Sequence, residues 1–201
     1  MAMEIIYSGF SRKDRNQIFE MKFFEKKIPE VLVLEPKVHI DERGYFMETF
    51  RASIFKDRGI KLEFVQDNQS SSRRGTLRGL HYQLQSPQGK LVRVVSGEVF
   101  DVAVDLRKSS KTFGGWVGEI LSAENKRQLW VPPGFAHGFL VLSDQAELSY
   151  KCTDYFNPAD EHILLWNDLT VAIDWPVNNL EVILSGKDRQ GASLSESEVF
   201  D

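Results

Sequence analysis

The stretch QGKLVRVVSGEVFDVAVDLR, residues 88–107, decides the fold class of this 201-residue chain. Its apolar and β-branched residues predict two strands, over 91–95 and 99–106. The link between them, Ser96-Gly97-Glu98, is short and contains a glycine. Because such a link suits a tight turn, we expect the two strands to form a hairpin.

The second of these strands alternates between apolar and polar side chains. One face carries only apolar residues, whereas Asp101 and Asp105 lie on the other face with Ala103. The two carboxylates are therefore expected to point either to solvent or into a polar cavity.

Short segments in which apolar and polar residues alternate continue along the rest of the chain. Further strands are predicted over 116–121, 128–131, 138–142, 147–153 and 163–166, and a short helix over 53–58. Neither a repeat nor a linker divides them. Many short strands at close spacing favour an all-β sandwich or barrel with a few short helices, for which a jelly roll is one solution.

The N-terminal segment differs from the remainder. Residues 1–20 are charged and weakly patterned, and Met21 begins a segment that reads as a natural start. We interpret residues 1–20 as an extension outside the core fold. Residues 21–201 are expected to form a single domain.

Composition excludes several classes of protein. The 25 basic and 29 acidic residues give a net charge of −4, which provides no general attraction for nucleic acid or anionic membrane. The single cysteine, Cys152, excludes an internal disulfide framework and fits a reducing cytoplasm. Without an apolar run of roughly 18 residues or the apolar core of a signal peptide, the chain is predicted to be cytoplasmic, with no membrane partner.

Two of the four histidines lie in polar, glycine-rich surroundings. His81 lies in GTLRGLHYQ, residues 75–83, with Lys90 close behind. Neighbouring cations favour a neutral imidazole, which suits a general base, although a structural histidine is an equal alternative. His137 follows a Pro-x-Gly turn, as metal-binding histidines do in cupin barrels. Those metal sites usually have a second histidine at the position of Gln83, so a role of His137 without a metal ion is favoured.

Three further segments offer groups for binding or proton transfer. Alternation over 146–153 places Tyr150 on one face with Leu148 and Cys152, toward a barrel interior, where a core tyrosine is the alternative interpretation. Segments 43–46 and 66–70 combine cations, amides and aromatic rings. These groups suit phosphate oxygens, a pyrimidine edge and a base face, but they are also ordinary surface residues.

Taken together, these segments resemble the dTDP-4-dehydrorhamnose 3,5-epimerase family, from about residue 27 to residue 194. The motifs that carry the resemblance are DERGYFMETF (41–50), FVQDNQS (64–70), GTLRGLHYQ (75–83), QGKLVRVVSGEVFDVAVDLR (88–107), SAENKRQLWVPPGFAHGF (122–139), YKCTDYFNP (150–158) and LSGKD (184–188). Several long motifs in one order are far more specific than a single histidine.

The resemblance implies a cupin-type jelly roll that works without a metal or organic cofactor. It implies a homodimer formed through exchanged N-terminal strands. The implied substrate is dTDP-4-dehydro-6-deoxy-D-glucose, epimerised at C3 and C5 to dTDP-4-dehydro-L-rhamnose. Nucleic acid is not an expected partner.

The resemblance also implies roles by matching position. His81 corresponds to the general base, Asp188 to its orienting carboxylate, Tyr150 to the acid and Lys90 to the cation beside the enolate. The implied substrate contacts are Arg43, Glu48, Gln66, Asn68, Arg78, His137, Glu161 and Lys187, with Arg43 and Glu48 reaching the neighbouring subunit. Asp101 is a weaker candidate.

The chain departs from the family pattern in three places, and three alternative functions remain open. The extension of residues 1–20 has no counterpart in the family. The link from His81 to Lys90 is one residue shorter than in some relatives, and Tyr155-Phe156 replaces a tyrosine pair. The chain could invert only C3 or C5, or act on another nucleotide-linked 4-keto sugar. It could instead be a metal-binding cupin or a catalytically inactive sugar-nucleotide binder.

Overall fold

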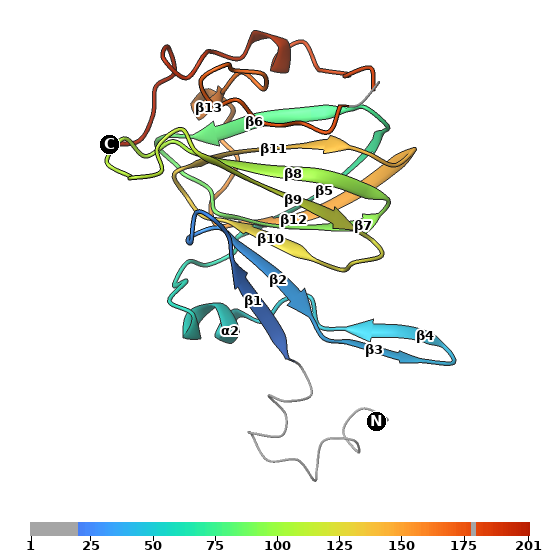
Figure 1. Ribbon diagram of the computed structural model, residues 1–201. Coiled ribbons are helices and arrows are strands. Elements are labelled where there is room, and N and C mark those ends of the chain that lie inside the picture. Colours follow the sequence, from blue (N-terminus) through green and yellow to red (C-terminus); the bar gives the residue numbers. More distant parts are fainter. Residues whose placement is uncertain (1–19, 178–179) are drawn as a thin grey trace.

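The computed structural model describes residues 20–177 and 180–201, which form two antiparallel sheets packed face to face (Figure 1). In spatial order, the first sheet consists of β1 (Met21–Glu25), β2 (Leu32–Pro36), β10 (Gln128–Val131), β7 (Lys90–Ser96), β12 (Gln145–Cys152) and β5 (Gln66–Arg73). The second consists of β13 (Glu161–Ile163), β6 (Leu77–Gln83), β11 (Phe135–Val141), β8 (Glu98–Asp105) and β9 (Trp116–Ser122). The predicted all-β jelly-roll sandwich is confirmed.

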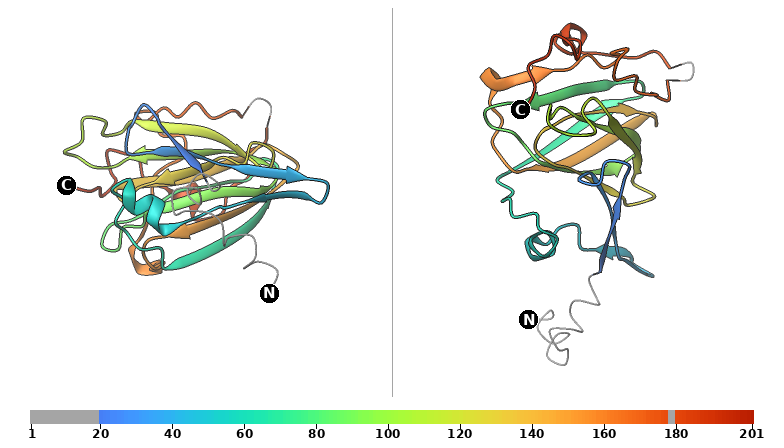
Figure 2. Two further views of the ribbon diagram at one scale, coloured as in Figure 1. Left: turned by 90° about the horizontal axis from the view of Figure 1, so that it is seen from below. Right: turned by 60° about the vertical axis from the view of Figure 1, so that its left-hand side comes forward.

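Smaller elements surround the sandwich. A separate hairpin of β3 (Val38–Asp41) and β4 (Gly44–Met47) projects from it (Figures 1 and 2). The described residues also form one α-helix, α2 (Ala52–Asp57), and two 3-10 turns, η1 (Pro158–Asp160) and η2 (Asp188–Gln190). No helix in these ranges has the length and apolar character needed to span a bilayer. Residues 1–19, nearly all of the expected extension, lie outside the described part of the chain.

Apolar side chains of the described residues form three clusters, one of which packs Phe55 of α2 against Leu91 and Trp130 of the first sheet. Between the sheets, Val92 and Leu148 from the first pack with Ala103 from the second. On the outer face of the second sheet, Val102 packs with Trp175 of the C-terminal segment, which runs over this face in Figure 1. The second sheet is therefore buried on both faces, which fixes the register of its strands.

The hairpin expected from residues 88–107 is wrong, because β7 and β8 lie in different sheets. β7 pairs with β10 and β12, whereas β8 pairs with β11 and β9. A strand with two buried faces belongs in the middle of a covered sheet, and β8 has no free edge for β7. Gly97, with φ +77°, lets the chain turn between the sheets, and a Cβ there would lie 2.1 Å from the carbonyl oxygen of Gln145.

Most of the other predicted elements are confirmed. β9, β10 and β12 match the strands predicted over 116–121, 128–131 and 147–153 closely. β11 begins at Phe135 rather than at residue 138, so His137 lies within a strand. The helix predicted over 53–58 is α2, which ends before Gly59 at φ +84°.

Two outcomes differ from the sequence patterns. The strand predicted over 163–166 is wrong: β13 ends at Ile163, and the chain then turns where the Asp168 carboxylate accepts the backbone N–H groups of Thr170 and Val171. β5 was not predicted, because its sequence QDNQSSSR is polar. It is an edge strand whose alternate side chains face the site described below, so a polar composition is compatible with a strand there.

The two aspartates of β8 are fully buried rather than solvated. Asp101 lies in the sandwich interior and bonds to His137. Asp105 accepts hydrogen bonds from the Arg107 guanidinium and from the Ser110 and Thr112 hydroxyls. The Asp105 carboxylate is therefore compensated for the water it loses on burial, whereas the Asp101 carboxylate is compensated at one oxygen only.

Candidate active site

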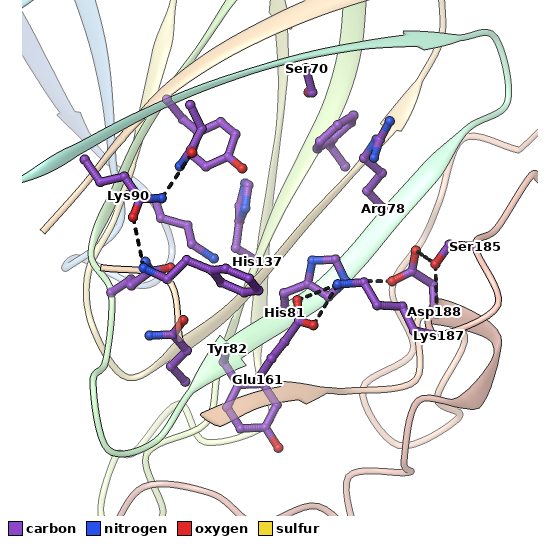
Figure 3. Close-up of a pocket in the computed structure, with 17 residues that line it drawn as sticks. Ser70, Arg78, His81, Tyr82, Lys90, His137, Glu161, Ser185, Lys187 and Asp188 are labelled. Carbon is purple, nitrogen blue, oxygen red and sulfur yellow. Dashed lines mark hydrogen bonds and ion pairs between the residues drawn. The ribbon is translucent and has the colours of Figure 1, made fainter. Parts of the chain in front are cut away.

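A cavity of about 320 Å³ opens between the two sheets at the end where β13 and η2 lie. Its walls are largely polar, and several of the residues that form them are labelled in Figure 3. The lining residues are Gln66, Asn68, Ser70, Arg78, His81, Tyr82, Gln83, Gln88, Lys90, His137, Phe139, Tyr150, Phe156, Glu161, Ser185, Lys187 and Asp188. All four predicted catalytic residues are among them.

His81 and Asp188 form a hydrogen-bonded pair in the cavity (Figure 3). Nε2 of His81 lies 2.6 Å from Oδ1 of Asp188, and the Ser185 hydroxyl donates to Oδ2 at 2.6 Å. Burial disfavours the Asp188 carboxylate, but the hydrogen bonds from His81 and Ser185 outweigh it and lower its pKa. An ionised Asp188 accepts the Nε2 proton, so the lone pair of the neutral imidazole is on Nδ1.

Two glycines bring the histidine strands together. β6 and β11 approach so closely that a Cβ on Gly79 would lie 2.7 Å from Cα of Gly138. Gly79 also has φ +118°, which favours glycine. His81 and His137 are register partners in this pair of strands. The close approach therefore places both imidazoles on one wall of the cavity.

His137 has a carboxylate partner of its own. Its Nε2 lies 2.8 Å from Oδ1 of Asp101, and Asp101 is completely buried. Within the described residues, the other carboxylate oxygen of Asp101 has no hydrogen-bond partner. Asp101 thus contacts His137 rather than lining the cavity, which makes it a supporting residue.

Tyr150 and Lys90 lie on the opposite wall, because β12 and β7 belong to the first sheet. Cys152 is the register partner of Lys90 on β12, two residues beyond Tyr150. Burial raises the pKa of the Tyr150 hydroxyl. Burial also lowers the pKa of Lys90, although the neighbouring Cys152, Asp101 and Glu161 act in the opposite direction.

The mouth of the cavity is lined by charged and amide side chains. The Lys187 ammonium lies 2.6 Å from the Glu161 carboxylate (Figure 3). Among the other lining residues, Gln66 donates to Asn68 at 3.1 Å, and the exposed Arg78 donates to Ser72 at 3.0 Å. These amides and cations can be redirected to a polar ligand, because their present partners are equally flexible side chains.

Arg43 and Glu48 do not line the cavity of their own chain. Arg43 lies in the β3–β4 hairpin with its side chain 85% exposed, 2.5 Å from Asp41. Glu48 pairs with Arg51 at 2.7 Å. The hairpin points away from the sandwich (Figures 1 and 2). Contact of these two residues with a neighbouring subunit stays a prediction.

Several lining residues were missed by the reasoning from sequence. They are Tyr82, Gln83, Gln88, Phe139 and Ser185, whereas Ser70 lies in the segment 66–70 that was offered for ligand binding and Phe156 in the aromatic pair noted in the sequence. The alternation along β5 carried the signal for Ser70, since Gln66, Asn68 and Ser70 all face the cavity. Phe156 lines the cavity whereas Tyr155 does not, so the ring without the hydroxyl is the one at the site.

Metal ligands do not converge in residues 20–177 and 180–201, where no group of three or more His, Cys, Asp or Glu side chains could hold an ion. The residue that stands where metal-binding cupins have a second histidine, Gln83, bonds to backbone groups of neighbouring loops. That the protein works without a metal ion stays a prediction, and elemental analysis of the purified protein tests it.

A jelly-roll sandwich with a histidine–aspartate pair facing a tyrosine and a lysine defines a cupin-type epimerase. Residues 25–196 match the family model described as dTDP-4-dehydrorhamnose 3,5-epimerase. The chain belongs to the dTDP-4-dehydrorhamnose 3,5-epimerase family, as its motifs predicted.

Individual relatives agree with this membership. The dTDP-4-dehydrorhamnose 3,5-epimerase of Shigella flexneri is 57% identical over 182 residues, covering 90% of this chain and 99% of that protein. The enzyme of the same name from Pseudomonas aeruginosa is 54% identical over 181 residues, with 90% and 99% covered. A dTDP-6-deoxy-D-glucose-3,5-epimerase from Legionella pneumophila, solved in complex with dTDP-4-keto-L-rhamnose, superposes with a TM-score of 0.87 at 53% identity, covering 89% and 95% of the two chains.

Proposed function

We propose that this chain epimerises dTDP-4-dehydro-6-deoxy-D-glucose at C3 and C5, giving dTDP-4-dehydro-L-rhamnose. The observation that carries the proposal is that His81 and Tyr150 line one cavity from opposite sheets. Relatives named for this activity, and the complex of the L. pneumophila enzyme with dTDP-4-keto-L-rhamnose, support the choice of substrate.

The reaction needs proton transfer and no net redox change. The hydrogens at C3 and C5 lie next to the C4 ketone, so removal of either gives an enolate with its charge mainly on the C4 oxygen. Nδ1 of His81 accepts the proton from one face of the sugar, and the Tyr150 hydroxyl returns a proton to the other face, which inverts the carbon. The resulting imidazolium and phenolate then exchange protons with water. General acid–base catalysis of this kind contributes about 10² to 10⁴ in rate.

Two charged residues assist this pair. Asp188 fixes the His81 tautomer and stabilises the imidazolium that forms. The Lys90 ammonium stabilises the enolate oxygen, and its burial strengthens this interaction because few waters screen it.

The remaining lining residues suit a nucleoside diphosphate. Arg78 and Lys187 provide cations for the diphosphate, and Gln66 and Asn68 provide amides for polar ligand atoms. His137 and Glu161 are assigned to the sugar. The Phe156 ring offers a face on which thymine can stack.

The working unit is proposed to be a homodimer in which Arg43 and Glu48 enter the partner's cavity. The supporting observation is the apolar surface of the β3–β4 hairpin, where Ile40, Tyr45 and Phe46 are all exposed. A projecting apolar hairpin is unfavourable in water and is stabilised by a second protein surface. Analytical ultracentrifugation of wild-type protein and of Phe46→Glu tests this, with a shift to monomer expected for the variant.

Incubation of the substrate with the protein in D₂O, followed by NMR at C3 and C5, tests the activity. Deuterium at both positions with inversion at both supports the proposal. Exchange at one carbon only assigns the chain to the single-site epimerases. Stoichiometric bound iron, zinc or manganese, with activity lost on chelation, would overturn the cofactor-free mechanism.

A further inference from the structure

The side-chain amide of Gln83 joins two loops at the mouth of the cavity. Gln83 is the last residue of β6 and is only 4% exposed. Its Nε2 donates to the carbonyl oxygens of Ser86 at 2.7 Å and Tyr155 at 3.2 Å, and its Oε1 accepts from the backbone N–H of Asn157 at 2.9 Å. Both donors and the acceptor of this amide are therefore used on backbone groups.

The bonded groups lie on either side of Phe156. Tyr155 and Asn157 are its chain neighbours, and the backbone N–H of Phe156 itself donates to Oε1 of Gln66 at 2.9 Å. Residues 155–157 belong to no strand or helix, so they lack the regular backbone hydrogen bonds of those elements. Hydrogen bonds with the side chains of Gln66 and Gln83 take their place. The Phe156 ring, which is 48% exposed, lines the cavity from this segment.

The other loop is held rigidly by Asp160. This buried carboxylate accepts hydrogen bonds from the backbone N–H groups of Leu84, Gln85 and Ser86 at 2.8–3.1 Å. Burial opposes its ionisation, but these hydrogen bonds outweigh burial and lower its pKa. Because the loop that carries the Ser86 carbonyl is fixed, Gln83 transmits that rigidity to residues 155–157.

We infer that Gln83 is a positioning residue that orients the Phe156 ring for stacking on the nucleobase. The inference rests on the proposed function, because it requires an aromatic base at Phe156. It also gives the amide at position 83 a use of its own, since an imidazole there has one donor too few to bond both carbonyls. Gln83 acts through backbone geometry and does not itself need to contact the reacting carbons.

Substitution of Gln83 tests this assignment. In Gln83→Glu the carboxylate has no donor for the carbonyl groups of Ser86 and Tyr155. Gln83→Met keeps the length of the side chain without a hydrogen bond or a charge. Gln83→Met can therefore be measured even if Gln83→Glu fails to fold. Gln85→Glu is the matched control, because Gln85 is exposed on the same loop. The measurements are the Kd of dTDP by calorimetry, and kcat and KM for deuterium exchange.

We expect both Gln83 variants to bind dTDP about tenfold more weakly and to raise KM by a similar factor, which lies within the range for loss of one base–aromatic stack. We expect kcat to stay within about twofold of wild type, because the proton-transferring groups are untouched. Gln85→Glu should match wild type in both measurements. Wild-type dTDP binding by Gln83→Met would overturn the inference.

A double variant separates positioning from general loosening of the fold. If Gln83 acts through Phe156, then Gln83→Met combined with Phe156→Ala binds dTDP no more weakly than Phe156→Ala alone. Additive losses would contradict the inference while leaving the proposed function intact. Failure of the wild-type protein to bind dTDP would instead overturn the proposed function itself.

Discussion

Nε2 of His81 lies 2.6 Å from Oδ1 of Asp188, although 107 positions separate the two residues in the chain. His81 lies on β6, and Asp188 begins η2 in the segment that covers the outer face of the second sheet. The orientation of the proposed base therefore depends on the docking of the C-terminal segment. Packing of that segment through Trp175 and Leu194 thus supports the site as well as the core.

Asp188→Asn is expected to lower the exchange rate by about 10² to 10⁴ while leaving the fold intact. An amide in this place can donate to Nε2 and so favours the wrong imidazole tautomer, as in other histidine–aspartate pairs. Ser185→Ala, which removes only the hydroxyl bonded to Asp188, should cost much less. The measurement is deuterium incorporation at both carbons under single-turnover conditions. Equal losses in the two variants would argue against a tautomer effect.

His81→Ala and Tyr150→Phe should fail in different ways. Without the base, exchange at C3 and C5 should be abolished, because no proton is removed. Without the Tyr150 hydroxyl, some exchange should continue through return of deuterium to the original face, but inversion should be impaired. NMR distinguishes exchange from inversion in a single experiment, and normal turnover by either variant would refute the assigned roles.

The alkaline limb of the pH–rate profile should report Lys90. Burial lowers the pKa of Lys90 and raises that of Tyr150, so on raising the pH the lysine loses its charge at a lower pH than an ordinary lysine, while the tyrosine keeps its proton. Since arginine stays protonated, Lys90→Arg should move the decline in kcat/KM to higher pH, even if the maximal rate falls. If the alkaline decline of kcat/KM in Lys90→Arg stays at the wild-type pH, it is caused by the titration of a group other than Lys90.

Gly138→Ala should destabilise the chain by about 1–3 kcal/mol, as overpacking typically does. The new Cβ would lie 2.6 Å from the carbonyl oxygen of Arg78, so β6 must move away from β11. Because His81 and His137 face each other across these strands, activity should fall as well. Gly186→Ala is the control for thermal unfolding, since nothing lies within 4 Å of its added Cβ. Equal melting temperatures for the two variants would contradict the prediction.

Asp105 should stabilise the fold in a pH-dependent way. Burial opposes ionisation of this carboxylate, but hydrogen bonds from Arg107, Ser110 and Thr112 lower its pKa to about 2. Because the pKa is lower in the folded than in the unfolded chain, the stabilisation is present above about pH 4 and is lost as the pH falls toward 2. Asp105→Asn should therefore cost about 2 kcal/mol at neutral pH and almost nothing near pH 2.

Urea unfolding at both pH values measures this difference. Asp67→Asn serves as the control, because Asp67 is an exposed partner of Lys151 and such pairs contribute roughly 0–1 kcal/mol. An Asp105→Asn effect that does not vary with pH would show that the carboxylate acts through packing alone.

Local patterns in the sequence predicted the elements whose environment is simple. β9 and β12 could be predicted because buried and more exposed positions alternate along much of each strand, and β10 because it contains the apolar run Leu-Trp-Val. β5 escaped prediction because its inner face lines a polar cavity instead of the core. The pairing of β7 with β8 was wrong because a short glycine turn suits a hairpin and a crossing between sheets equally well.

The sequence alone determined the all-β class, the family and the types of group that carry the proposed chemistry, since alternation and ordered motifs are local properties of the chain. The family motifs led us to expect the pairing of His81 with Asp188, and the structure brings the two side chains into contact. Tertiary structure alone decided that His137 meets Asp101 and that Gln83 meets the segment that carries Phe156. It also placed Tyr150 and Lys90 opposite His81 by putting β12 and β7 in a different sheet from β6. The physical reason is that the sheet a strand joins depends on which of its faces are buried by distant parts of the chain, rather than on neighbouring residues.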